Sequence, residues 1–133
     1  MTLDQDAISE VTAANDRFYR AFESLDAEQM AQVWVQDDSA QVIHPGWTLK
    51  LGWEEVRESW AAIFANTSYM EFHLTDVHVL VSGPWARVTC VENLRSIAGG
   101  QENTGQVQAT NLFTLTGDRW LMVHHHGSPI FTG

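Results

Sequence analysis

Basic residues are scarce in this 133-residue sequence, which has seven Lys and Arg against seventeen Asp and Glu and a formal net charge of −10. The seven are scattered singly along the chain. Nucleic-acid backbones and anionic membrane surfaces are bound through clustered Lys and Arg. We therefore expect neither nucleic acid nor membrane as a partner, and we interpret the acidic surface as a solvated one.

Cysteine is scarcer still, because Cys90 is the only one. No intramolecular disulfide can form, which favours a reducing compartment. No stretch approaches the ~18 consecutive apolar residues of a membrane span. Residues 1–10 have neither a basic start nor an apolar run, so no secretion signal is expected. Together these absences predict a cytoplasmic location.

Motifs for cofactors and metals are also missing. The sequence has no Walker loop, no nucleophile elbow and no dinucleotide fingerprint, so we predict no cofactor. It has no pair of cysteines and no HExxH segment. His124 and His126, with His44 as a third ligand, are one way to hold zinc, but their spacing is not specific. We therefore predict no metal site.

The apolar residues that are present change their spacing after Asn66. Before it, three- and four-residue spacing predicts a first helix up to about residue 25, a short second helix capped by Asp26, and a third over 53–65. A short strand is expected over 40–44. After it, four long strand-like runs cover 69–81, 85–97, 106–116 and 120–126. Helices followed by an antiparallel meander predict a single α+β domain over residues 1–133, with a curved sheet around a pocket.

Three glycine-containing turns, at 83–84, 99–100 and 117–118, set the expected register of the meander if each is a two-residue loop. Counting from them gives one almost wholly apolar face, which the helices should cover. The members of this inner face are Val77, Val79, Val81, Ala86, Val88, Cys90, Ala109, Phe113, Leu115, Trp120 and Met122. The opposite, outer face would carry Leu74, Leu80, Leu94, Leu112, Leu121 and Val123, and this apolar character predicts a homodimer through it.

Four polar residues share the inner face and gather near one end of the sheet: Glu92, Asn111, His124 and His126. A buried polar group needs a partner or a ligand, so function is expected here. In this register Asn111 lies opposite His124. Asn111 could orient that imidazole or bind a ligand carbonyl, or it could make a simple cross-strand hydrogen bond.

Glu92 and His124 are the candidate catalytic residues. Burial would raise the pKa of Glu92 and suit it to proton transfer, although a salt bridge with Arg95 or His126 is an equal alternative. Imidazole is the usual physiological proton carrier, so His124 could act in the pocket, or its hydrogen bonds could be structural. Ligand contacts are expected from Asn111, His126, Tyr19, His44 and Trp47, the last because it follows Pro45-Gly46 in a loop.

Four segments carry a family likeness: 15–22 (NDRFYRAF), 43–47 (IHPGW), 52–56 (GWEEV) and 120–129 (WLMVHHHGSP). In this order they resemble the SnoaL-like branch of the nuclear transport factor 2-like superfamily. They are more distantly similar to the association domain of calcium/calmodulin-dependent kinase II. The resemblance implies a cone, in which a strongly bent, mainly antiparallel sheet and three helices enclose a cavity, and dimers through the outer sheet face.

The same resemblance leaves activity open, because members include isomerases, cyclases, dehydratases, binding domains and assembly modules. Steroid isomerases of this superfamily use an Asp as the base and a Tyr and a protonated Asp as hydrogen-bond donors to the oxyanion. We cannot assign these three roles to residues of this chain. Two hypotheses follow. The first is a domain that binds a small apolar or carbonyl-bearing molecule in a pocket with a His/Asn/Glu cluster. The alternative is a cofactor-free isomerase, cyclase or dehydratase with His124 or Glu92 as general base.

Overall fold

The computed structural model describes residues 3–131, so residues 1–2 and 132–133 of the expected domain lie outside the described residues. Three helices are formed: α1 (Leu3–Ser24), α2 (Ala27–Ala31) and α3 (Gly52–Ala65). Six strands are formed: β1 (Gln41–Ile43), β2 (Lys50–Leu51), β3 (Thr67–Ser82), β4 (Trp85–Ala98), β5 (Gln101–Thr116) and β6 (Arg119–Pro129). The fold is α+β, as the spacing predicts.

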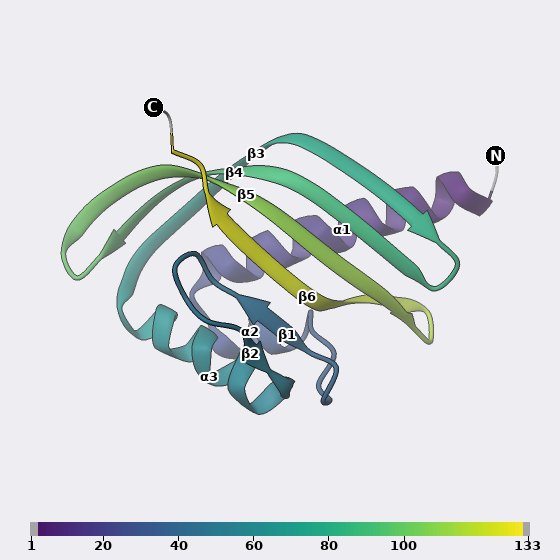
Figure 1. Cartoon of the computed structure of the whole chain (residues 1–133), viewed down its shortest axis with the longest axis horizontal. Helices are drawn as coiled ribbons and strands as arrows, with labels where there is room; N and C mark the ends of the chain where they lie inside the picture. The colour runs from purple at the N-terminus through teal and green to yellow at the C-terminus, as the bar shows by residue number, and fades with distance from the viewer. Residues whose placement is uncertain (1–2, 132–133) are drawn as a thin grey trace.

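The six strands form one sheet in the order β2-β1-β6-β5-β4-β3. All neighbours pair antiparallel except β1 and β6, which are parallel. The long strands bend strongly, α1 lies across the concave side, and α2 and α3 lie at one end of it (Figure 1). No helix within the described part of the chain is long and apolar enough to cross a membrane.

The helices bury the apolar stripes read from the sequence. Val11 and Phe18 of α1 are fully buried, and so is Val56 of α3. Asp26 caps α2, since its carboxylate accepts hydrogen bonds from two backbone N–H groups of the first turn, at 2.8 and 3.4 Å. The α2 helix ends at Ala31, and the following chain leads into β1.

The three two-residue turns occur where they were predicted, and the β4–β5 register is confirmed over its whole length. Val88 faces Asn111, Cys90 faces Ala109 and Glu92 faces Val107. The inward-facing residues of these strands are largely buried, which is the alternation expected of a sheet with one covered face.

The predicted register of β6 is wrong beyond Met122. Phe113 still pairs with Met122, but Leu112 pairs with His124 and Asn111 with His125, so Val123 is an extra residue in a bulge. A bulge reverses which side each later residue faces. His124 and His126 therefore lie on the outer face, and His125 faces inward.

A second bulge lies in β3, where the register shifts between Thr75 and His78 and Asp76 has a φ of 53°. Val77, expected inside, is 43% exposed at this point. Leu74, expected outside, pairs with Glu92 and faces inward. The same correction applies to Leu94, because it lies two residues from Glu92 on the same side of β4 and pairs with buried Phe72.

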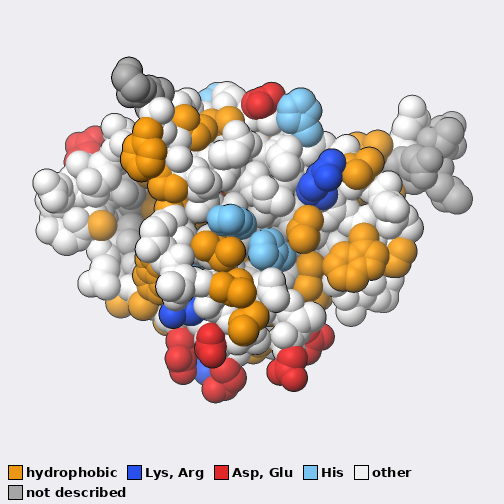
Figure 2. Space-filling model, in the orientation of Figure 1, with side chains coloured by type: hydrophobic (Ala, Val, Ile, Leu, Met, Phe, Trp, Pro, Cys, Tyr) orange, Lys and Arg blue, Asp and Glu red, His pale blue; other side chains and the backbone are white. Residues whose placement is uncertain are grey.

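The outer face of the sheet keeps part of its predicted apolar character. Leu80 and Trp85 are both 52% exposed, and with Leu112 and Arg87 they line one surface hollow. Val123, expected on this face, is instead buried at the β6 bulge. Figure 2 shows this side of the molecule, with hydrophobic side chains and histidines near its middle and acidic side chains along one edge.

Candidate functional site

A buried carboxylate lies at the centre of the inner face. Glu92 is 3% exposed, and its Oε2 accepts a hydrogen bond of 2.6 Å from the hydroxyl of Tyr19 on α1. Burial raises the pKa of Glu92 to about 7, and the Tyr19 hydrogen bond opposes part of that rise. The group therefore changes its protonation state near neutral pH.

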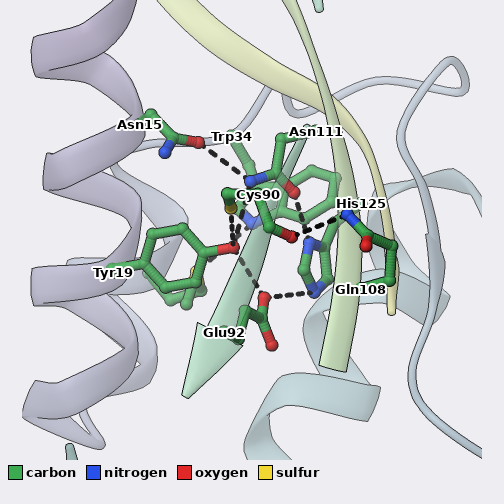
Figure 3. A network of polar contacts seen from close by, with 9 residues as sticks. Asn15, Tyr19, Trp34, Cys90, Glu92, Gln108, Asn111 and His125 are labelled. Atoms are coloured by element: carbon green, nitrogen blue, oxygen red, sulfur yellow. Dashed lines mark hydrogen bonds and ion pairs between the residues drawn. The ribbon is translucent and has the colours of Figure 1, made fainter. Parts of the chain in front are cut away.

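Asn111 on β5 joins α1 to the sheet. Its amide nitrogen donates to Asn15 Oδ1 at 2.9 Å and to the Tyr19 hydroxyl at 3.1 Å. Asn15 and Tyr19 lie four residues apart, on one face of α1, so both point at the same place on the sheet (Figure 3). Since both amide hydrogens are used, the Asn111 oxygen is left as an acceptor.

His125 on β6 supplies the partner of that oxygen. Its Nδ1 lies 2.6 Å from Asn111 Oδ1, and because the oxygen can only accept, Nδ1 carries the hydrogen. The neutral ring then has its lone pair on Nε2, which lies 3.9 Å from Glu92 Oε2. Burial, with smaller effects from neighbouring histidines, lowers the pKa of His125 well below its ordinary value, so the ring is neutral.

The hydrogen bonds have one direction throughout. His125 donates to Asn111, Asn111 donates to Tyr19, and Tyr19 donates to Glu92 (Figure 3). Burial and the neighbouring Glu92 raise the pKa of Tyr19 well above its ordinary value, so its hydroxyl keeps its proton. Cys90 Sγ, 3.5 Å away, also contacts this hydroxyl. Burial raises the pKa of Cys90 to about 11, so the thiol is protonated at neutral pH.

An internal cavity of about 180 Å³ lies next to this network. Glu92, His125 and His44 form its polar side. The rest of its lining is apolar: Phe22, Pro45, Trp47, Ile63, Met70, Phe72 and Leu94. A mostly apolar cavity with a few convergent polar groups is the usual form of a small-molecule site. A larger hollow of about 650 Å³ lies over β3, β4 and β5, but it is open and lined largely by charged and polar side chains.

The loop after β1 closes one side of the cavity. His44 is 2% exposed, and its Nε2 lies 2.9 Å from Ser59 Oγ, whose own hydrogen goes to the Val56 carbonyl. Nε2 of His44 is therefore the donor. Burial, with a smaller effect from Lys50, lowers the pKa of His44 to about 4. Exposed Trp47 packs edge-on against His44 at 5.0 Å and forms the solvent side of the cavity.

The structure brings together some of the predicted site residues and separates others. Glu92, His44 and Trp47 line the cavity. Tyr19 and Asn111 do not; they lie behind it and hold Glu92 and His125.

His124 and His126 point away from the cavity. His124 Nδ1 lies 3.1 Å from Gln41 on the outer face, and His126 is exposed. A zinc site formed by His44, His124 and His126 is therefore wrong, because His44 lies on the inner side of the sheet and the two other histidines lie on the outer side. No group of three or more possible metal-ligating side chains occurs among the described residues. The salt-bridge alternative for Glu92 fails as well, since Arg95 pairs with Glu102 at 2.7 Å on the outer side and His126 lies exposed on the outer face.

Sequence reasoning missed His125, Asn15 and Ser59. Strand alternation alone puts His125 on the side opposite to His124 and His126, and nothing in the residues around Val123 indicates the bulge that reverses this. Asn15 had a usable signal, since it lies one helical turn before Tyr19. Ser59 had none, because its contact depends on how α3 packs against the loop after β1.

The family model of the SnoaL-like domain matches residues 11–132. The chain therefore belongs to the SnoaL-like domain family, within the nuclear transport factor 2-like superfamily. The resemblance read from segments 15–22, 43–47, 52–56 and 120–129 is confirmed.

Two solved structures and one plant protein are similar to this chain. An NTF2-like family protein from Streptomyces avermitilis with the provisional name of dehydratase is 36% identical, with a TM-score of 0.91 over 97% of this chain and 99% of its own. A Thiobacillus denitrificans protein, provisionally named a calcium/calmodulin-dependent protein kinase type II association domain, is 30% identical, with a TM-score of 0.80 over 90% and 94%. F-box protein SKIP8 of Arabidopsis thaliana is 27% identical over 96% of this chain, which spans 58% of that relative's length.

Proposed function

We propose that this domain binds a small, mainly apolar molecule in the internal cavity, and that Glu92 transfers a proton on it, as in isomerisation or dehydration. The observation that carries the proposal is a carboxyl group buried beside an apolar cavity, with its pKa raised to about 7. A general acid or base works best when its pKa lies near the working pH. The provisional dehydratase name of the 36% identical Streptomyces protein supports the same chemistry.

The neighbouring groups have distinct parts in this proposal. Glu92 in its ionised form takes a proton from a carbon next to a carbonyl, and in its protonated form returns a proton elsewhere on the same molecule. His125 Nε2 accepts a hydrogen bond from a ligand hydroxyl. The 3.9 Å between Nε2 and Glu92 Oε2 is too long for a direct hydrogen bond, so one polar ligand atom can contact both. Tyr19 and Asn111 are positioning residues, because they hold these two groups without lining the cavity.

The experiment measures proton exchange rather than an assumed reaction. Cyclohex-2-en-1-one is incubated with the protein in deuterium oxide, and loss of its exchangeable proton signals is followed by NMR across pH. We expect the protein to accelerate exchange, with a sigmoidal pH dependence centred near the Glu92 pKa of about 7. Glu92→Gln should lower the enhancement by about 10²-fold or more, which is the size of a general-base contribution.

His124→Ala is the matched control, because it removes an imidazole from the same strand but on the outer face. It should leave the exchange rate unchanged. Glu92→Gln exchanging protons as fast as the unmodified protein would overturn the catalytic role. Binding of the ketone with no acceleration by the unmodified protein would also overturn it and reduce the function to ligand binding.

A further inference from the structure

The cavity is small compared with most ligand sites. Its volume is about 180 Å³, whereas sites for drug-sized molecules measure about 300–1,000 Å³. A closed apolar cavity of about 150 Å³ accommodates benzene. The space next to Glu92 and His125 therefore fits one six-membered ring with short substituents, and we expect it to disfavour a second fused ring.

The apolar lining favours a flat, unsaturated ring. Phe22 and Phe72 meet edge to face at 4.6 Å, and both line the cavity. Met70 lies on the same lining, and thioether sulfur makes favourable contacts with ring edges. Trp47 lines the cavity on its solvent side. The edges of these phenylalanine rings and the methionine sulfur are complementary to the face and the edge of an aromatic or conjugated ligand ring.

The polar side of the cavity favours a neutral ligand. None of the described residues that line it is Lys or Arg. His44 and His125 have lowered pKa values and are uncharged at neutral pH, and Glu92 is the one lining group that becomes charged there, with a negative charge. An anion would lie beside that carboxylate without a compensating cation, which is costly in a buried place. A carbonyl can instead accept a hydrogen bond from protonated Glu92, and a hydroxyl can donate one to Nε2 of His125.

We propose that the substrate is a neutral, single-ring, unsaturated compound carrying a carbonyl or hydroxyl group, which enters with its polar group towards Glu92 and His125. This rests on the proposed function for what happens to the substrate, but size and charge selection depend on the cavity alone. Leu94 is the residue to shorten in a test of size, because it lines the cavity next to Phe72, its cross-strand partner on the same face of the sheet.

Binding of three probes tests the proposal: phenol, 2-naphthol and benzoate, measured by NMR titration at about pH 7. Hydrophobicity alone would make 2-naphthol the tighter ligand, because it buries more apolar surface. Since the cavity is small, we expect the opposite order, with phenol binding at least tenfold tighter than 2-naphthol. Benzoate should bind at least tenfold more weakly than phenol. Leu94→Ala should enlarge the cavity and bring 2-naphthol level with phenol or above it.

Leu80→Ala is the matched control, because it shortens a leucine on the outer face and should leave all three affinities unchanged. The proposal is overturned if 2-naphthol binds the unmodified protein as tightly as phenol does. It is equally overturned if benzoate binds within threefold of phenol.

Glu92→Gln separates this proposal from the catalytic one. If this variant keeps the preference for phenol while the unmodified protein exchanges no protons, the selection is supported and the catalytic step is refuted. If the unmodified protein exchanges protons but shows no selection by size or charge, the reverse holds.

Discussion

Replacing Glu92 by Gln should change how the stability of the protein depends on pH. The folded state holds the Glu92 proton with a pKa of about 7, against an ordinary value of 4.5 for the unfolded chain. Between these two values the folded state binds more protons than the unfolded state, so the free energy of unfolding falls as pH rises. Above about pH 7 the full cost of an ionised buried carboxylate is present. Gln is close in shape and can still accept the Tyr19 hydrogen bond, but it has no proton to lose.

The size of the effect follows from the two pKa values. Each pKa unit corresponds to about 1.4 kcal/mol, so the group should destabilise the protein by about 2–3 kcal/mol as the pH rises from about 5 to about 8. His44 acts in the opposite direction, because its pKa is lowered to about 4 and its stabilising contribution is lost as pH falls below 6.5. His125 acts in the same direction as His44, since its pKa is also lowered. Both histidines remain in the variant, so only the difference between the two proteins isolates Glu92.

Urea denaturation of both proteins at four pH values from about 5 to about 8 measures that difference. The free energy of unfolding of Glu92→Gln, minus that of the unmodified protein, should rise by about 2–3 kcal/mol across the range. Glu58→Gln removes a carboxylate from an exposed position on α3 and controls for the change in net charge. A Glu92→Gln difference that stays constant with pH, to within about 0.5 kcal/mol, would refute the conclusion that this carboxyl is desolvated.

Two further predictions concern the two faces of the sheet. Val88→Asp should destabilise the protein by more than about 3 kcal/mol, because it buries a charge beneath α1, whereas Arg87→Asp on the outer face should cost less than about 1 kcal/mol; denaturant unfolding that gave the opposite order would contradict the observed β4 register. We also expect a two-fold dimer through the outer face, where Trp85 and Leu80 are 52% exposed. Light scattering at micromolar concentration should give about 30 kDa, twice the 15.0 kDa chain, and Trp85→Glu should shift it towards the monomer, whereas a monomer for the unmodified protein would rule the dimer out.

The parts of the fold that the sequence predicts well are those set by local turns. The turns at Gly83-Pro84, Gly99-Gly100 and Gly117-Asp118 are each two residues long, so counting from the middle one places Glu92 and Asn111 correctly on the inner face. The counts fail in β3 and β6 at bulges, which follow from the curvature of the whole sheet. On the side of β6 that faces away from β5, Met122 pairs with Trp34 before the bulge, and His124 to His126 pair with β1 after it.

The site shows the same division. Glu92 could be predicted because strand alternation and its apolar neighbours place it inside. The position of Tyr19 depends on the rotation of α1, which its apolar stripe predicts only approximately. The roles of Tyr19 and Asn111 as supports behind the cavity could not be predicted, because the same inner-face position would be consistent with lining it. The choice among the three histidines depended on one extra residue.

The bulge at Val123 and the run of three histidines after it have a joint consequence for errors in strand pairing. If β6 slipped by one residue and lost the bulge, His124 would take the place opposite Asn111 that His125 now holds. The amide oxygen would still meet an imidazole. Consecutive identical residues thus make this contact tolerant of the alternative register, although the outer face would then lose His124 and His126 and gain His125. The repetition therefore keeps an imidazole opposite Asn111 in either register.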